Sequence, residues 1–275
     1  MTSSTEAVAR VHHQLLFMQR MIFLLGLLLF ITLSENVEAQ RGFAADTLED
    51  LIIYSNERSG VVVAHSRGLG IGYRAGKNVN AFRTRSIAVE LVSINSGKQI
   101  KTINPYYANS KRYTYGKLND VLLLRAGMSN KMLLNRKPYW GGVEVRFIYE
   151  GGLSLGLMKP YYLFVIKINQ LPFGGLDYVI ETQRFNADSY SWDDIYGRAP
   201  FTKGLNEIKL VPGAYAKVGF NFEFGAVKTT TRAFEAGVIT DFFPQNLAIM
   251  DDARNQKLFL NFYISYAFGK RFNKY

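Results

Sequence analysis

The chain has 275 residues, carries a net charge of +11 and contains no cysteine. The lack of cysteine excludes disulfides, thiolate metal sites, cysteine nucleophiles and a lipid-modified cysteine at a signal boundary. Of the three histidines only His65 lies beyond residue 39, which argues against zinc sites and histidine-based catalytic triads. We therefore expect no enzyme activity, no bound metal and no cofactor.

The N-terminus is predicted to be an export signal. Residues 22–33, IFLLGLLLFITL, form an apolar run behind Arg20, and the polar SENVEAQ with its small-residue pattern follows. This order is typical of a cleaved secretory signal, and the run is too short for a comfortable transmembrane helix. We expect cleavage after Ala39.

Cleavage at this point raises the positive charge of the chain. Removing Arg10 and Arg20 leaves 31 of the 33 basic residues, and removing Glu6, Glu35 and Glu38 leaves 19 of the 22 acidic residues, so the net charge becomes +12. Such a balance favours anionic surroundings. For an exported protein, phospholipid or lipopolysaccharide is a better partner than nucleic acid.

Beyond the signal, segments of about ten residues alternate apolar with polar or small side chains and are separated by turns, as transmembrane β-strands require. No stretch there is apolar for long enough to be a membrane helix. We expect an all-β fold, a transmembrane antiparallel up-and-down β-barrel of eight strands that closes by pairing the last strand with the first. The expected strands are 61–73, 81–94, 115–128, 142–150, 153–167, 208–223, 232–242 and 258–275.

The domain organisation follows from these two predictions. The expected parts are a signal peptide at 1–39, with an upstream extension at 1–17 if translation starts at Met18 or Met21, a periplasmic segment at 40–58 and an outer-membrane β-barrel at 59–275.

An even number of strands places both termini on one side, which for an exported barrel is the periplasm. The turns expected outside the cell are 74–80, 129–140, 168–207 and 243–256, and those expected in the periplasm are near 150–153, where EGG reads as a reversal, and 224–228. The basic segment 96–117 is long for the periplasmic side, which makes it a candidate contact for another protein. If EGG is not a turn, the fourth and fifth strands merge, and residues 174–185 have to supply a replacement.

Charged residues on the expected strands fall at inward positions. At the bilayer midplane an arginine or lysine that faces lipid costs roughly 2–4 kcal/mol. Eight strands enclose an interior that side chains just fill, so we expect a packed plug of paired charges, with a narrow pore as the alternative; paired catalytic carboxylates would need a cleft. The expected lumen network comprises Glu90, Arg125, Glu144, Arg146, Glu150, Lys217, Glu223 and Glu235.

Two further groups of residues suggest contacts outside the lumen. A basic group around the first outward turn suits lipopolysaccharide phosphates or is a solvated rim; it comprises Arg74, Lys77, Arg83 and Arg85. In the loop 185–201, FNADSYSWDDIYGRAPF, the carboxylates of Asp188, Asp193 and Asp194 do not have the spacing of an EF-hand calcium loop. Its aromatic residues are expected to pack on the loop or on a partner, and these are Tyr190, Trp192 and Tyr196.

Four stretches carry a resemblance to a known family: INPYYANSKRYTYGKLND, GGVEVRFIYEGGLSLGLMKPYYL, GAYAKVGFNFEFG and YISYAFGKRFNKY. They resemble an uncharacterised family of outer-membrane β-barrel proteins of Bacteroidota, over about residues 59–275. The resemblance implies a Gram-negative outer-membrane location and a barrel, but no reaction and no catalytic residues. Small barrels of this kind also serve as accessory subunits of outer-membrane insertion or secretion machines.

The expected function is therefore that of an integral outer-membrane component with a charged, largely occluded lumen, which acts as a structural or partner-binding protein. Its expected partners are outer-membrane lipid, lipopolysaccharide and other outer-membrane or periplasmic proteins. The alternatives are an accessory subunit of a larger machine and a small pore, and a membrane-embedded lipid enzyme is the weakest alternative.

Overall fold

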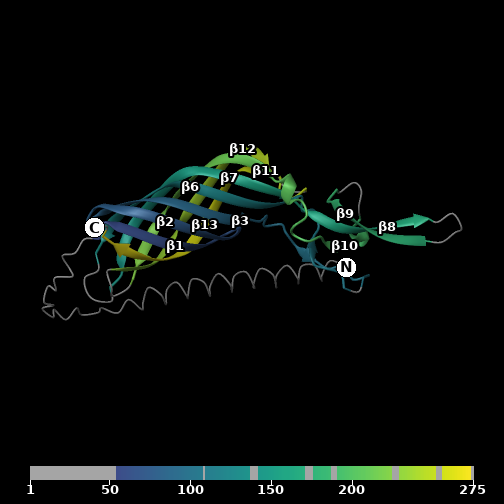
Figure 1. Cartoon of the computed structure of the whole chain (residues 1–275), viewed down its shortest axis with the longest axis horizontal. Coiled ribbons are helices and arrows are strands. Elements are labelled where there is room, and N and C mark those ends of the chain that lie inside the picture. The colour runs from purple at the N-terminus through teal and green to yellow at the C-terminus, as the bar shows by residue number, and fades with distance from the viewer. Residues whose placement is uncertain are drawn as a thin grey trace, which may run out of the picture. The chain divides into compact units, whose positions relative to one another are not determined.

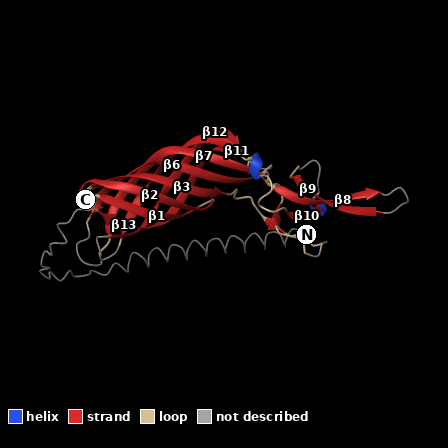
Figure 2. Ribbon diagram, in the orientation of Figure 1, coloured by secondary structure: helices blue, strands red, loops and turns tan. Residues whose placement is uncertain are grey.

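The computed structural model describes residues 54–107, 109–136, 142–170, 176–186, 191–224, 229–251 and 256–273. The expected signal peptide, most of the expected periplasmic segment, Asp188 and Tyr190 lie outside these ranges. Strands dominate the described chain, and two short 3-10 helices, η2 (Trp192–Asp194) and η3 (Leu205–Glu207), interrupt them (Figure 2). Among the described residues the structure contains no helix with the length and hydropathy needed to cross a membrane.

Eight antiparallel strands form a closed ring in the order β1-β13-β12-β11-β7-β6-β3-β2 (Figure 1). The ring closes because β1 pairs with β13 along its whole length, from Asn56 opposite Phe272 to His65 opposite Tyr263. The predicted eight-stranded antiparallel barrel is confirmed. Its strands are β1 (Asn56–His65), β2 (Gly68–Asn80), β3 (Arg83–Ile94), β6 (Asn119–Asn135), β7 (Glu144–Pro160), β11 (Lys209–Glu223), β12 (Thr230–Leu247) and β13 (Gln256–Phe272).

The barrel has two different ends. Both chain termini of the ring lie at one end, which we call the terminal end, where the Ser55 amide donates to Asn273 Oδ1 at 2.7 Å. The connections at this end, after β2, β6 and β11, are short. The opposite, distal end carries the two-residue turn at 66–67, the connection 248–255 and the two long connections 95–118 and 161–208.

The distal connections contain strands of their own. A three-stranded sheet has the order β10-β8-β9, and β4 pairs with β5. These strands are β4 (Lys101–Thr102), β5 (Tyr113–Thr114), β8 (Tyr162–Gln170), β9 (Leu176–Arg184) and β10 (Ile195–Arg198).

The first predicted strand, 61–73, is wrong, because it is a hairpin of β1 and β2. Val61 and Val63 are buried inside the barrel, whereas Leu69 and Ile71 are exposed on its outside. The alternation therefore changes phase at Ser66 and Arg67, which form the turn. The predicted turn 74–80 is also wrong, since these residues continue β2 as far as Asn80.

The predicted EGG reversal is wrong as well, because β7 runs without a break from Glu144 to Pro160. Its glycines serve close packing between strands. Gly152 lies opposite Gly127 on one neighbour and opposite Tyr215 on the other. A Cβ on Gly127 would come within 2.7 Å of the Tyr215 hydroxyl and within 2.4 Å of the Gly151 carbonyl oxygen.

The hairpin at 61–73 adds one strand to the prediction and the uninterrupted β7 removes one, so the predicted number of eight strands is still correct. Several connections, however, lie at the other end of the barrel from the predicted one. The turn after β6, part of the predicted 129–140, lies at the terminal end rather than outside the cell. The segment 96–117 lies at the distal end together with 168–207. The prediction that it lies on the same side as the two termini is therefore wrong. The predicted replacement strand, 174–185, exists as β9 but belongs to the distal sheet.

Candidate functional site: the barrel lumen

The two faces of the barrel wall differ in chemistry, as the period-two alternation of a strand requires. On the outside, Leu153 and Phe262 are 74% and 71% exposed, and they belong to a band of apolar side chains around the wall. On the inside, Arg125, Glu235 and Asp241 are fully buried. The strands thus hold ionised side chains in the middle of the barrel and apolar ones on its surface.

A central layer of charges crosses the lumen. Arg125 on β6 donates twice to Asp241 on β12, from Nε to Oδ1 at 2.8 Å and from Nη2 to Oδ2 at 2.7 Å. The paired fork of bonds is the strongest geometry available to a guanidinium and a carboxylate. Lys217 Nζ on β11 lies 2.6 Å from Glu90 Oε1 on β3. Each pair joins strands that are not neighbours in the ring.

Arg74 on β2 connects the acids of this layer. Its guanidinium pairs with Glu235 on β12 and lies 3.4 Å from Glu90 Oε1 and 3.7 Å from Glu150 Oε2. Tyr215 completes the arrangement by donating its hydroxyl to Glu150 Oε1 at 2.8 Å. Removing one member would leave its partner as a buried, unpaired charge, which costs about 3–5 kcal/mol.

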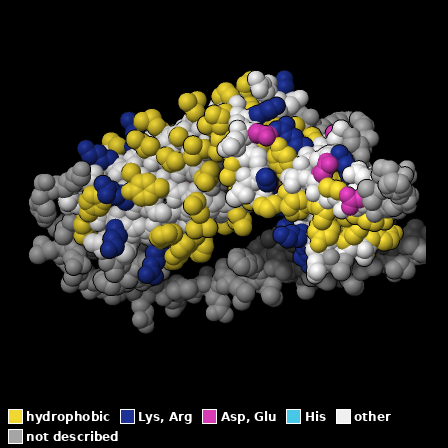
Figure 3. All heavy atoms as spheres, turned by 45° about the vertical axis from the view of Figure 1, so that its right-hand side comes forward, with side chains coloured by type: hydrophobic (Ala, Val, Ile, Leu, Met, Phe, Trp, Pro, Cys, Tyr) yellow, Lys and Arg dark blue, Asp and Glu magenta, His cyan; other side chains and the backbone are white. Residues whose placement is uncertain are grey.

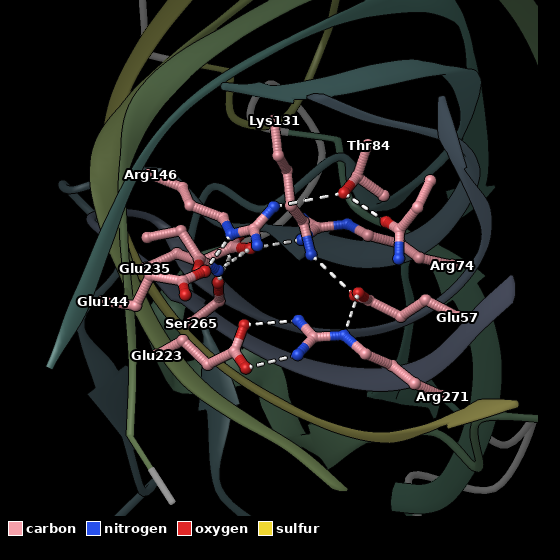
Figure 4. Close-up of polar contacts among 12 residues, drawn as sticks. Glu57, Arg74, Thr84, Lys131, Glu144, Arg146, Glu223, Glu235, Ser265 and Arg271 are labelled. Atoms are coloured by element: carbon pink, nitrogen blue, oxygen red, sulfur yellow. Dashed lines mark hydrogen bonds and ion pairs between the residues drawn. The ribbon is translucent and has the colours of Figure 1, made fainter. Parts of the chain in front are cut away.

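A second layer of charges lies nearer the terminal end. Arg271 on β13 reaches across to Glu223 on β11 with two bonds of 2.8 and 2.6 Å and also donates to Glu57 Oε2 at 3.1 Å. Lys131 on β6 donates from Nζ to the other carboxylate oxygen of Glu57, Oε1, at 3.0 Å. Figure 4 shows Arg271 between the two glutamates, with Lys131 reaching toward Glu57 from the opposite wall. Beside them, Arg146 pairs with Glu144 and donates to Thr84.

The distal third of the lumen is apolar. Buried side chains from the inner faces of β3, β6, β7, β11, β12 and β13 and from the connection after β12 pack into one cluster there. Phe243 and Phe259 contact each other edge to face, with ring centroids 6.1 Å apart. The cluster comprises Val92, Ile94, Val121, Leu123, Met158, Val211, Phe243, Leu247, Ile249, Met250 and Phe259. Two ionic layers and this distal apolar layer therefore occupy the lumen, and a second, smaller apolar cluster from the inner faces of β1, β11, β12 and β13 completes the packing. It comprises Val61, Val63, Tyr215, Ala233, Ile239, Tyr263 and Ala267.

All eight side chains predicted to form the lumen network lie on inward-facing positions, and most of them pair with one another or with Arg74. The prediction did not include five further members: Glu57, Arg74, Lys131, Asp241 and Arg271. Asp241 could have been found, because it shares the parity of Glu235 on the predicted strand 232–242. Arg271 could also have been found, because it lies in the predicted strand 258–275 with the parity of the inward Asn261 and Ser265. Glu57 and Lys131 lay beyond the predicted strand ends, and Arg74 lay in the wrongly predicted turn.

Of the four basic residues predicted to contact lipopolysaccharide, one points into the lumen and three point outward. Arg74 is 2% exposed and belongs to the lumen, so its predicted lipid contact is wrong. Lys77, Arg83 and Arg85 point outward on β2 and β3. They lie near the terminal end, not at an outward turn of the distal end, because residues 74–80 are strand.

The distal connections pack on one another. Buried Asn104 donates to the carbonyl oxygens of Asp193 and Ile195 at 2.9 Å each, and Tyr113 donates to that of Trp192 at 3.1 Å. The Trp192 and Tyr196 rings contact those of Tyr106 and Tyr107, respectively. The sequence analysis did not identify Asn104 as the residue that joins these two connections. Its only local feature is the proline that follows it, and this does not indicate which carbonyl groups the side chain would bind. Within the described ranges no three acidic or histidine side chains form a group that could hold a metal ion.

The distal sheet has its own core, separate from the barrel clusters. It comprises Tyr113, Tyr161, Leu163, Val165, Phe185 and Ile195, with Leu118 partly buried beside them. Burial raises the pKa of the Tyr113 and Tyr161 hydroxyls above their ordinary value. Both phenols therefore stay neutral in the folded sheet.

The scan against protein-family models and the search of curated proteins give no match. Several solved structures are similar. Neisserial surface protein A shares 12% identity, with 80% of this chain and 97% of that chain covered and a TM-score of 0.35. Ail, the attachment invasion locus protein of Yersinia pestis, shares 6% identity over 80% of this chain and 100% of that chain, with a TM-score of 0.36. The N-terminal β-barrel domain of Pseudomonas aeruginosa OprF shares 9% identity over 78% and 97%, with a TM-score of 0.34. At these values the fold assignment comes from the strand pairing of the chain itself.

Proposed function

We propose that the protein is an integral outer-membrane barrel with a sealed lumen, which acts as a structural anchor and as a platform for a binding partner. The observation that carries the proposal is the inverted distribution of side chains. Large apolar residues such as Phe262 and Leu153 cover the outside of the wall, and the charges are paired within it. A protein in water has no reason to expose such a band, whereas a barrel in lipid requires one.

Figure 3 supports this distribution on the face that it shows. Apolar side chains cover the middle of the barrel, basic ones lie at its left-hand end and again toward the distal sheet, and acidic ones are visible only toward the distal sheet. The Gram-negative outer membrane is the proposed location because closed barrels of this size with their termini on one side are typical of it. The export signal at 1–39 and the origin in Bacteroidota are proposed from the sequence pattern and the motif resemblance.

The three layers of the lumen favour an anchor over the alternative of a small pore. Ionic pairs join opposite walls at two levels, and the apolar cluster excludes water at a third. A hydrated ion would have to separate several of these contacts to pass.

The test is expression of the full chain in a Gram-negative host, followed by membrane fractionation and gel migration with and without heating. We expect the chain in the outer-membrane fraction, with a folded form that migrates differently from the heated one. Planar-bilayer recordings with the purified protein should show no channel events. A folded chain that stays soluble without detergent would refute the membrane proposal, and steady conductance would refute the sealed lumen.

A partner-binding role is favoured by the distal sheet. Pairing of β8 with β9 places Ile168 opposite Tyr178 and Ile166 opposite Ile180 on one face. Ile168, Tyr178 and Ile180 are 58%, 61% and 52% exposed, and such apolar surfaces mark contact sites. An accessory subunit of an outer-membrane machine is one form of this role.

The test is affinity capture from native membranes in mild detergent. The variant Ile168→Asn/Tyr178→Ser/Ile180→Thr should lose the captured proteins, because it removes the apolar face. The matched control, Asn169→Ser/Asp177→Asn, changes the opposite face of the same hairpin and should retain them. Recovery of the wild-type protein alone, in repeated experiments, would refute the partner-binding role and leave the anchor proposal standing.

A further inference from the structure

The outer surface of the barrel carries a cluster of basic side chains at the terminal end, on five strands that are neighbours in the ring: β12, β13, β1, β2 and β3. All of these side chains are exposed and occupy outward positions. We call the cluster the basic rim, and it comprises Arg58, Lys77, Arg83, Arg85, Arg232 and Lys270.

The basic rim has no anionic counterpart in the described part of the protein. The acids of these five strands, Glu57, Glu90, Glu235 and Asp241, all point into the lumen. The polar and ring contacts of the rim are few: Arg85 Nε lies 3.4 Å from Asn130 Oδ1, and the Arg58 guanidinium lies over the Phe272 ring.

The strand register places like charges opposite each other. Arg58 pairs with Lys270 across β1 and β13, and Lys77 pairs with Arg85 across β2 and β3. Directly opposed like charges destabilise a sheet. Two such pairs on adjacent strands, with no acid on the same face, indicate that anions from outside the protein offset their repulsion.

The position of the rim identifies that anion. One or two outward positions further along each strand the wall becomes apolar: Ile87 follows Arg85, Phe268 precedes Lys270 and Phe234 follows Arg232. At the strand rise of about 3.3 Å per residue, the rim lies within about one headgroup layer of the hydrocarbon. Lipid phosphates occupy this level, and guanidinium forks match phosphate oxygens.

We propose that the basic rim binds the phosphates of anionic phospholipids in the leaflet that surrounds the terminal end. The inference rests on the proposed function, because it requires the barrel to span a membrane. An even-stranded barrel has its termini in the periplasm, so the rim faces the phospholipid leaflet and not lipopolysaccharide. The bound lipid lies along one side of the wall, since β7 and β11 carry Phe147, Phe220 and Phe222 at the corresponding outward positions.

The experiment uses the full-length protein, reconstituted into vesicles of phosphatidylcholine alone or mixed with phosphatidylglycerol, extracted mildly and examined by native mass spectrometry. Wild type should retain phosphatidylglycerol preferentially. The variant Lys77→Gln/Arg83→Gln/Arg85→Gln should retain it at least about tenfold less, because it removes three of the six cations that attract the lipid phosphates. Added salt should reduce the wild-type preference.

The matched control is Lys203→Gln/Lys209→Gln/Lys257→Gln, which removes three exposed basic groups at the distal end and should leave retention unchanged. Equal loss in both variants, or equal retention in wild type and rim variant, would overturn the inference. In a further set of vesicles that contain both phosphatidylglycerol and lipid A, a preference for lipid A would also overturn it. The heat-dependent gel shift verifies that each variant is folded. A wild-type chain that does not insert into vesicles at all would instead refute the proposed function.

Discussion

Arg125 shows at the scale of one residue how the barrel can hold a charge in a membrane. Its side chain is fully buried, and its fork of bonds to Asp241 is supplemented by Glu90, whose Oε2 lies 3.7 Å away. Burying either ion alone would cost several kcal/mol, and only the pairing offsets this cost. The lumen is therefore stable as a set of pairs, and single charges within it are not tolerated.

We predict that Arg125→Leu lowers the free energy of unfolding by about 3–5 kcal/mol, because Asp241 loses its partner without access to water. The double variant Arg125→Leu/Asp241→Leu should recover most of this loss. Denaturant unfolding in detergent micelles, followed by circular dichroism, measures both. A double variant that is as unstable as the single one would contradict the prediction. As a control, Lys167→Leu, which affects an exposed ion pair with Glu181, should change stability by no more than about 1 kcal/mol.

Gly127 provides a second prediction at this scale, since the Tyr215 hydroxyl and the Gly151 carbonyl oxygen occupy the space of a side chain. We expect Gly127→Val to destabilise the barrel by about 2–3 kcal/mol, as overpacked sites do, and to weaken the folded band on an unheated gel. Gly97 has no heavy atom within 4 Å of an added Cβ. Gly97→Val should therefore stay within about 0.5 kcal/mol of wild type, and similar losses in the two variants would contradict the packing explanation.

At the scale of strands, most of the barrel could be predicted from the alternation of side chains. The outer face of β13, from Leu258 to Phe268, and the inward charges of β7 follow the expected phase. The errors arose where local turn signals competed with that phase. RAGKNVN and EGG contain the residues of turns, but the alternation continues through both, and there the phase was the better guide. At Ser66 the alternation itself misled, because the apolar residues keep the same parity on both sides of the turn although Val63 points inward and Leu69 outward.

The distal sheet could not be predicted in the same way. Residues 162–170 and 176–184 read as strands, but nothing in their pattern says that they leave the barrel, because their pairing partners are each other and the short β10. Likewise, the alternation along a strand predicts which charged side chains point into the lumen but not which of them form pairs. Lys217 and Glu90 lie on strands that are not neighbours, and they meet only because the sheet closes into a ring.

We predict that the barrel folds without the distal sheet. β7 and β11 pair up to Met158 and Lys209, so replacing residues 162–206 with a short turn joins two strands that are already neighbours. The truncated chain should insert into membranes and keep its heat-dependent gel shift, while losing any partner captured through the hairpin. A second variant has the same deletion and a longer Gly/Ser linker. If only the variant with the short turn misfolds, the short connection is strained. Misfolding of both would contradict the prediction.

For the whole molecule, the layered lumen implies that closure is redundant. The apolar cluster draws on six of the eight strands, and ionic pairs cross the lumen at two further levels, so removing one layer leaves the others. We predict no channel events for Phe243→Ser/Phe259→Ser, which weakens the apolar layer, and none for Arg125→Leu/Asp241→Leu. Combining these four substitutions with Glu57→Gln/Arg271→Gln, so that the ionic layer near the terminal end is weakened as well, should produce measurable conductance in planar bilayers. Conductance in either two-residue variant would show that a single layer closes the lumen.

The join between β7 and β8 gives the molecule a mechanical property. Tyr161 is the only residue between the two strands, its side chain is buried, and its amide donates to Leu118 at 2.9 Å. The hairpin is thus an extension of a strand that is bonded on both sides within the wall. Tension applied to the hairpin would be transmitted lengthwise into the barrel and borne in shear by two ladders of hydrogen bonds, without a flexible tether to absorb it.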